Sequence, residues 1–505
     1  MILDTTTVDR DVTLTTEVCI VGSGAGGAVV AKELVERGRA VVMVEEGPYL
    51  TARDFTQREE QMLPRLYADQ GLRAGVDATV MIAHGRLVGG STVPSFCLCA
   101  RTPRQILNYW AKAFSLSHMG LEDLFPYFER VEAAASVHPM TATDVNKNNA
   151  TFKTGADRLG LRNHLPAHNR IDCLGCGYCE LGCAYDRKGD ALTVHVPAAS
   201  QRGAVIIPSC RVEQINVADG HAAGVTGLFL RSRTGKPFTL TVHARTVVLA
   251  AGALGSPALW LRSQLPNPHG QVGRNLHLQP QVVLGALFNE EIAGWRGIPQ
   301  SVVVDEFLTL ERSIDGGYLL MPFFAHPVVT ACILPGFGAG YRTLTDAYSR
   351  LALAAVMLHD RTAGRLELDS TGRITISYHL NDEDRADLMD GMRRVADIYF
   401  AAGAQRVILP FNELVDLTHR DEYRPLDAHP FRTNDPLLFS HHPQGTLRMG
   451  ADPRQAVTNS YGEAHTVKGL FVADASVFPT SVAVPPQLSV MAFALRTAQH
   501  IADSA

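Results

Sequence analysis

Four cysteines stand within one eleven-residue stretch, CLGCGYCELGC, in a chain that holds nine cysteines in all. Cys173, Cys176, Cys179 and Cys183 follow the spacing CxxCxxCxxxC, in which short turns can gather thiolates around one iron–sulfur cluster. Bacterial runs of this kind place a proline after the last cysteine, whereas Ala184 follows here. Zinc ribbons separate two CxxC pairs by a longer spacer, so zinc fits this compact run poorly. The sequence leaves a cluster, zinc and packing thiols as the alternatives.

A glycine-rich turn near the start of the chain provides a second pattern. An apolar strand leads into Gly22, Gly24 and Gly27, which form GxGxxG, and a helix and a second strand over 41–44 follow. The first glycine permits a tight turn, the second lets a pyrophosphate approach the backbone, and the third lets helix and strand pack closely. Glu45 ends the second strand, where a carboxylate can take ribose hydroxyls. These residues predict a βαβ unit with a dinucleotide at the helix N-terminus.

Length and composition limit the classes of protein. The chain has 505 residues with 46% apolar and 19% charged content, which is typical of a globular protein of two or three domains. Its 46 Lys and Arg against 51 Asp and Glu give a formal charge of -5, which indicates neither nucleic acid nor an anionic membrane as partner. The start of the chain lacks the features of a secretory signal, and no stretch is apolar for a membrane span. We expect no transmembrane segment and a cytoplasmic location, where clustered cysteines favour metal or redox roles over disulfides.

Three further segments carry a resemblance to a known family. They are HGRLVGGSTVPSFCLCARTP (84–103), TVVLAAGALGSPALW (246–260), and, near the C-terminus, SHHPQGTLRMG (440–450) with GLFVADASVFPTSVAVPPQLSV (469–490). With the first glycine motif they resemble the glucose-methanol-choline (GMC) oxidoreductase family, most closely its long-chain alcohol oxidase and cholesterol oxidase-like branches. The resemblance implies an α/β fold, with an FAD-binding Rossmann-like domain and a discontinuous α+β substrate domain built on an antiparallel sheet. It also implies an FAD-dependent enzyme that oxidises the CH–OH group of an apolar alcohol.

The resemblance implies which residues hold FAD beyond the first glycine motif. They are Gly89, Gly90 and Ser91 of the second glycine loop, the backbone of Val212 beside the adenine, Asp474 near the ribityl or pyrophosphate group, and Gln487 at the start of the C-terminal helix. Two prolines precede that helix as a start signal. A helix N-terminus directed at the flavin would stabilise the negative charge of the reduced ring.

The same resemblance implies that His442 is the catalytic base, which takes the hydroxyl proton while hydride passes to flavin N5. Imidazole suits this role because its pKa of ~6.5 lies near neutral pH. In an extended segment the neighbouring His441 would point to the opposite face. The sequence departs from the family at Pro485, where a second histidine or an asparagine is usual, and at Ser95, where an asparagine is frequent. Because proline has no side-chain donor or acceptor, a flavoprotein without net alcohol oxidation, such as a lyase, isomerase or decarboxylase, stays open as the alternative.

The electron acceptor depends on the cysteines. A flavin beside a cluster would pass single electrons to an external quinone or redox protein, whereas a flavin alone could pass two to dioxygen. The positions of the motifs predict a discontinuous FAD-binding domain and a substrate-binding domain that includes a loop over 136–172, a hairpin over 365–380, and two apolar stretches, 318–324 and 351–358, that could line a pocket or simply be core. The predicted FAD-binding domain comprises residues 1–110, 173–280 and 440–505, and the substrate-binding domain comprises 111–172 and 281–439.

Overall fold

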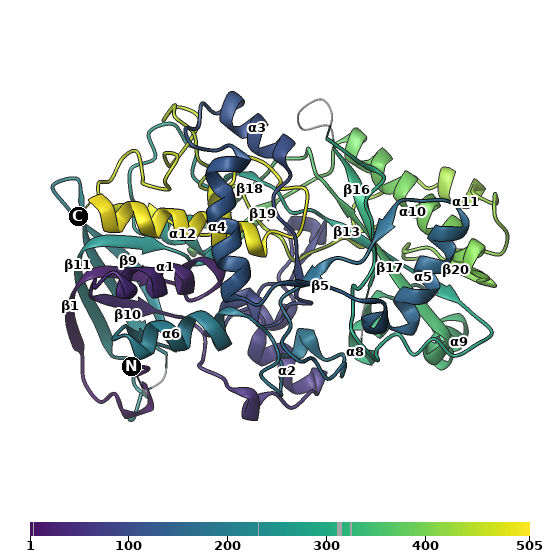
Figure 1. Ribbon diagram of the computed structural model, residues 1–505, viewed down its shortest axis with the longest axis horizontal. Helices are drawn as coiled ribbons and strands as arrows, with labels where there is room; N and C mark the ends of the chain where they lie inside the picture. Colours follow the sequence, from purple (N-terminus) through teal and green to yellow (C-terminus); the bar gives the residue numbers. More distant parts are fainter. Residues whose placement is uncertain (4, 231, 311–315, 324–325, 505) are drawn as a thin grey trace.

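The computed structural model describes residues 1–3, 5–230, 232–310, 316–323 and 326–504. Two lobes lie side by side in Figure 1, and both ends of the chain are in the first lobe. Each lobe is built on one large sheet. The apolar core of the first lobe reaches residues of the second sheet such as Met321 and Met357, and a separate core lies within the second lobe. This arrangement confirms the expected α/β fold with a Rossmann-like part and an antiparallel second part.

The sheet of the first lobe is mainly parallel. Its strand order is β8-β2-β1-β11-β10-β9, with β23 pairing with β11, and β9 and β10 are the antiparallel members. The inner ends of its central strands are fully buried because helices cover the sheet, so they read as continuous apolar runs. The strands are β1 (Val12–Val21), β2 (Val41–Val44), β8 (Val205–Ile207), β9 (Cys210–Ala218), β10 (His221–Phe229), β11 (Thr239–Leu249) and β23 (Leu470–Val472).

The helices of the first lobe include the predicted βαβ helix and the predicted C-terminal helix. They are α1 (Ala25–Glu36), α2 (Glu59–Leu66), α3 (Arg104–Ala113), α4 (Leu121–Ala134), α6 (Val196–Gln201), α7 (Gly252–Arg262) and α12 (Gln487–Ser504). Helix α12 packs against α1 and α4, as the yellow helix in Figure 1 shows. Part of the segment 111–172 therefore lies with the first sheet, and the domain boundaries drawn from the sequence stay a prediction.

The sheet of the second lobe has ten strands and is almost entirely antiparallel. Its centre, β13-β17-β16, is buried along its whole length and packs against the long helix α10 (Asp382–Ala402). The strands are β3 (Met81–Ile82), β6 (Asn163–His164), β13 (Gln281–Leu287), β14 (Val303–Val304), β15 (Leu308–Thr309), β16 (Gly316–Pro322), β17 (Leu351–Leu358), β20 (Arg406–Ile408), β21 (Asp416–Leu417) and β22 (Phe439–Ser440).

The remaining strands form two small sheets. The predicted hairpin is confirmed, because β18 pairs antiparallel with β19, although its third neighbour is β12 rather than a strand of the large sheet. The strands are β12 (Arg274–Leu276), β18 (Gly364–Leu368) and β19 (Ile374–Ser377) in one sheet, and β4 (Leu98–Cys99), β5 (His138–Pro139) and β7 (Ala167–His168) in the other.

The expectation of a loop over 136–172 is wrong, because α5 (Lys147–Arg158) lies within it. Asn146 caps this helix by accepting from the amide of Asn149, and α5 packs against α10. The remaining helices of the second lobe are α8 (Pro327–Ile333), α9 (Gly338–Asp346) and α11 (Arg424–Asp427). Within the described ranges, no helix combines the length and the apolar character that a bilayer crossing requires.

Candidate active site

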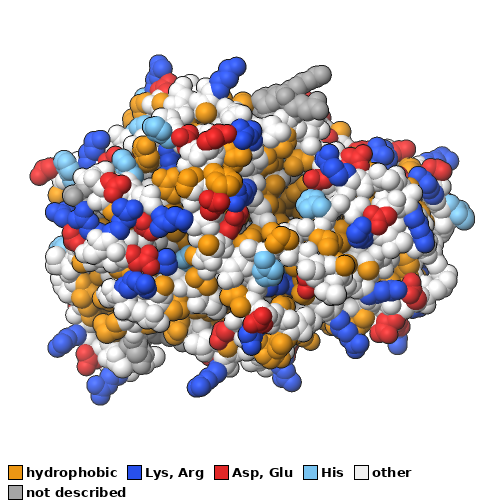
Figure 2. All heavy atoms as spheres, viewed as in Figure 1, with side chains coloured by type: hydrophobic (Ala, Val, Ile, Leu, Met, Phe, Trp, Pro, Cys, Tyr) orange, Lys and Arg blue, Asp and Glu red, His pale blue; other side chains and the backbone are white. Residues whose placement is uncertain are grey.

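A cavity of about 840 Å³ runs between the two lobes. Figure 2 shows hydrophobic side chains gathered around a hollow between the two halves of the molecule. The cavity collects residues that are far apart in the chain, because β1 and β2 end at it and β9 and α12 begin at it. It is lined by most of the residues predicted to hold FAD: Gly22, Gly24, Glu45, Gly90, Ser91, Val212, Asp474 and Gln487, together with Pro485 and the predicted base His442.

Two predicted glycines do not line this cavity but support it. A Cβ on Gly27 would lie 2.0 Å from the carbonyl oxygen of Gly22, so this glycine permits the close packing of α1 on the turn. Gly89 has a left-handed backbone with φ +95°, and its amide donates to Ser23 Oγ at 3.1 Å. Both residues therefore hold the two glycine loops in place rather than face the cavity.

The two glycine loops meet at the N-terminus of α1. A Cβ on Gly24 would have only the Cα of Gly90 within 4 Å, at 3.8 Å, whereas a Cβ on Gly90 would come within 2.8 Å of the Gly24 Cα. Backbone N–H groups at a helix start are unsatisfied by the helix itself and attract phosphate. The open space over Gly24 and these donors fit the pyrophosphate of FAD.

Two buried carboxylates stand at either end of this cradle. Glu45 accepts from the amide and hydroxyl of Ser23 and from the amide of Gly47. Asp474 accepts from the Gly252 amide, the Ser256 hydroxyl, and the amide and hydroxyl of Ser476. Burial raises the pKa of both carboxyl groups. The hydrogen bonds act in the opposite direction, but burial has the larger effect. The carboxyl groups are thus fixed in position at the cavity wall.

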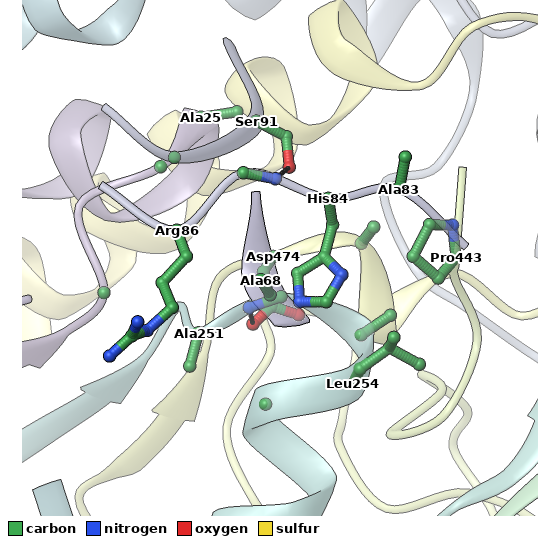
Figure 3. Close-up of a pocket in the computed structure, with 18 of the residues that line it drawn as sticks. Ala25, Ala68, Ala83, His84, Arg86, Ser91, Ala251, Leu254, Pro443 and Asp474 are labelled. Carbon is green, nitrogen blue, oxygen red and sulfur yellow. Dashed lines mark hydrogen bonds between the residues drawn. The ribbon is translucent and has the colours of Figure 1, made fainter. Parts of the chain in front are cut away.

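His84 is a cavity residue to which the sequence reading gave no role. Its Nε2 lies 3.4 Å from Nη1 of Arg73, and its Nδ1 is buried without a hydrogen-bond partner. Burial and the charge of Arg73 lower the pKa of His84 to about 3, so the ring is neutral. In Figure 3 the ring of His84 points into the cavity, between Ala68 and Leu254.

His442 lies at the cavity wall just after β22. Its Nδ1 is buried and has no hydrogen-bond partner in the protein. Burial, together with the neighbouring His441, lowers the pKa of His442 to about 3, and the carboxylate of Asp360 acts in the opposite direction. The imidazole is therefore neutral and has a free nitrogen, which is the form that accepts a proton.

The expectation that His441 points away from His442 is wrong. Both residues line the cavity, and their ring centroids lie 6.4 Å apart at an interplanar angle of 63°. The strand β22 ends at Ser440, so the alternation of an extended strand does not continue through the pair. Gln444 then fixes the turn, because its side chain donates to the His442 carbonyl and accepts from the Val482 amide.

The four clustered cysteines surround a second, much smaller cavity of about 20 Å³. Cys173, Cys176, Cys179 and Cys183 all line it, and so does Cys97 from the segment after the second glycine loop. The amides of Gly175 and Arg187 donate to the sulfurs of Cys173 and Cys183. Among the described side chains, no three His, Cys, Asp or Glu groups come together tightly enough to hold a metal ion. This finding supports neither the zinc site nor the iron–sulfur cluster that the cysteine spacing left open.

The two cavities share a wall. Ser95 and Phe96 line the large cavity, while the next residue, Cys97, lines the small one. In the same way Cys179 lines the small cavity and Glu180 the large one. Burial raises the pKa of Glu180 to about 8. Two short segments therefore separate the cysteines from the space predicted for the flavin.

Comparison with protein families gives two matches that together span most of the chain. The N-terminal domain of GMC oxidoreductases matches residues 63–281, and their C-terminal domain matches residues 360–494. An NAD(P)-binding Rossmann-like domain matches residues 20–77. An uncharacterized GMC-type oxidoreductase of Mycobacterium tuberculosis is 33% identical over 95% of this chain and 75% of its own length. A long-chain-alcohol oxidase of Arabidopsis thaliana is 29% identical over 96% of this chain and 68% of its own length.

Solved structures show the same fold. Pyridoxine 4-oxidase from Mesorbium loti superposes with a TM-score of 0.70 at 20% identity, over 96% of this chain and 99% of that one. Formate oxidase superposes with a TM-score of 0.72 at 16% identity, over 98% of this chain and 99% of that one. The two-lobed arrangement around a central cavity is thus a known one.

Proposed function

The chain belongs to the GMC oxidoreductase family and is an FAD-dependent oxidoreductase, and on this premise we propose that it oxidises the CH–OH group of an apolar alcohol to a carbonyl. When bound, FAD supplies the two-electron acceptor that takes hydride from the carbinol carbon. The observation that supports this proposal best is the placement of His442, whose neutral imidazole lies in the same cavity as the dinucleotide cradle and keeps one nitrogen without a partner.

His442 then takes the hydroxyl proton as the hydride leaves the carbon. A neutral histidine can do so at any pH above its own pKa, which burial holds well below the usual ~6.5. Pro485 lines the cavity but offers no hydrogen bond. We assign the second contact with the substrate hydroxyl to His441, the other imidazole at this wall.

Apolar side chains line part of the cavity, beside polar ones such as Gln281 and Gln300. Met321 and Phe323 of β16 and its continuation line it together with Phe96. Of the two stretches predicted as possible lining, 318–324 supplies Met321 and Phe323, and Phe324 lies outside the described part of the chain. No residue of 351–358 lines the cavity, because that stretch is the central strand β17. An aliphatic or aromatic alcohol fits this surface, in keeping with relatives named long-chain-alcohol oxidases.

The electrons must then leave the flavin, and we propose the four-cysteine site as their route. Cys173, Cys176, Cys179 and Cys183 would hold an iron–sulfur cluster, which would accept one electron at a time and would suit a quinone or redox protein as the external acceptor. The spacing of the cysteines, their common cavity and the short wall to the flavin space support this route. The cavity holds about one water molecule as it stands, so loading requires the thiols to move apart.

The test combines spectroscopy with a matched pair of histidine variants. Protein purified without oxygen should show flavin bands that bleach when a suitable alcohol is added, and no bleaching with any alcohol would favour the non-redox alternative. His442→Ala should keep FAD and lose roughly a hundredfold to ten-thousandfold in turnover. His465→Ala is the control, because His465 Nε2 donates to the Gly450 carbonyl outside the cavity, and this variant should keep normal turnover. Measurement of iron and acid-labile sulfide in the same sample shows whether the protein holds a cluster.

A further inference from the structure

Gln281 is a buried amide at the wall of the large cavity. It is the first residue of β13, only 4% of it is exposed, and it lines the cavity. Within the described part of the chain, its side-chain amide has no hydrogen-bond partner. Burying an amide without a partner is costly, because the hydrogen bonds to water are lost and not replaced. A group that enters the cavity can supply the missing hydrogen bonds.

The neighbours of Gln281 on its face of the sheet are apolar. Residues directly opposite each other on neighbouring strands share a face, and so do alternate residues of one strand. Gln281 lies opposite Met357 of β17, and Met357 lies opposite Leu319 of β16. Val283 and Met321 follow on the same face, and these four apolar residues all belong to the core of the first lobe. Packing alone therefore does not explain an amide at this position.

Strand pairing brings Gln281 next to the segment that carries the proposed base. Gln281 pairs with Phe439 of β22, and His442 follows the end of that strand. Met321, which shares the face of Gln281, lines the same cavity. The amide is thus placed with the residues assigned to the substrate, and not with the glycine loops that fit the pyrophosphate.

A second buried amide makes the cavity more polar than a simple apolar alcohol requires. Gln300 is 8% exposed and lines the cavity, and its side chain likewise finds no hydrogen-bond partner among the described residues. Its backbone is held in place, because His168 Nε2 donates to the Gln300 carbonyl at 3.0 Å. A primary amide offers two N–H donors and one carbonyl acceptor. A hydroxyl group both donates and accepts, so it can pair with either end of such an amide.

We propose that Gln281 is a specificity-determining residue that binds a second hydroxyl group of the substrate, so that the preferred substrate is a diol or polyol with an apolar body. The inference rests on the proposed alcohol oxidation. One hydroxyl group lies at His442 and is oxidised, while the other hydrogen-bonds to the amide of Gln281. A site built to bind a hydroxyl group discriminates against a substrate without it, because the buried amide then stays unpaired.

The experiment measures how fast alcohols bleach the flavin of the FAD-loaded protein in the absence of oxygen. Each unbranched mono-alcohol from butanol to decanol is compared with the terminal diol of the same length. At the length that spans the two groups, the diol at limiting concentration should bleach the flavin about ten- to a hundredfold faster. Q281M should abolish this preference, because methionine is a similarly long, unbranched side chain without an N–H donor. Q499M is the control and should keep the preference, because the Gln499 amide donates to Glu33 and does not line the cavity.

Stability and FAD affinity separate this role from a structural one. Because the amide of Gln281 has no partner among the described residues, Q281M without substrate should unfold at the same temperature as the unchanged protein or at a higher one. A lower unfolding temperature would mean that the amide supports the fold, and weaker FAD binding would mean that it contacts the flavin. Either result overturns the proposal.

The outcomes also distinguish this inference from the proposed oxidation. A diol preference that disappears in Q281M supports the role of Gln281. If mono-alcohols bleach the flavin as fast as diols at every length, or if Q281M keeps the preference, this role is overturned while alcohol oxidation stands. If neither mono-alcohols nor diols bleach the flavin, the proposed oxidation is wrong and the role of Gln281 is overturned with it.

Discussion

Gly24 is the position at which FAD binding can be separated from folding. Its backbone has φ −71° and ψ −158°, a negative φ that alanine also tolerates. A methyl group there would make one ordinary van der Waals contact, with the Gly90 Cα at 3.8 Å. The cost to the protein is then that of an alanine at a helix N-cap, roughly 1 kcal/mol or less.

The methyl group would instead fill the space over the N-terminus of α1, where the pyrophosphate fits. Loss of one hydrogen bond to a charged group costs roughly 1.5–3 kcal/mol. This corresponds to about a ten- to hundredfold increase in Kd. We therefore expect Gly24→Ala to bind FAD ten- to a hundredfold more weakly while the protein without FAD unfolds at nearly its normal temperature.

The assay is thermal unfolding with and without added FAD, together with the FAD content of the purified protein. Gly26→Ala is the matched control two residues away, because its Cβ would lie 1.6 Å from the carbonyl oxygen of Ala473 and force α1 away from β23. That variant should lose stability whether or not FAD is present. Unchanged FAD affinity in Gly24→Ala would refute the pyrophosphate placement, and a loss of stability equal to that of Gly26→Ala would refute the separation from folding.

Three other predictions concern the two cavities. Asp360→Asn should move the acid limb of the kcat/KM–pH profile to lower pH. The carboxylate of Asp360 raises the pKa of His442, so without it burial lowers this pKa further. An acid limb at unchanged pH would contradict this prediction. Glu45→Gln should weaken FAD binding by about tenfold with the fold intact, as measured by FAD titration. Gly182→Ala should release iron but keep FAD, because its φ is +82° and a Cβ would lie 2.5 Å from the ring of Phe55; metal analysis beside the flavin spectrum checks it.

The dinucleotide cradle could be predicted from the sequence because its geometry is local. Gly22, Gly24 and Glu45 lie within one βαβ unit, where the turn, the helix start and the strand end follow from residue type. The helix from Gln487 was found for the same reason, since two prolines precede it. In contrast, α5 was missed because its polar Asn and Thr residues conceal the apolar side that meets α10.

Features set by distant parts of the chain could not be predicted. The ten-stranded sheet takes β3 and β22 from segments that also border the large cavity. The direction of His441 depends on where β22 ends, and that end is fixed by pairing with β13 and β3 rather than by the pattern SHHPQ. A buried arginine gives no sequence signal at all, because Arg170 reads as a surface residue in the stretch HNRID.

The shared wall between the cavities allows the proposed electron route to be tested separately from alcohol oxidation. The segment from Ser95 to Cys97 touches both cavities, and Arg170 holds its Phe96 carbonyl from the cysteine side. Arg170 contacts the large-cavity residue Phe96 through its carbonyl, whereas His442 lines the large cavity and not the small one. The chemical step and the electron route should consequently respond to different substitutions, and the rate of flavin bleaching by alcohol should survive the loss of the arginine charge.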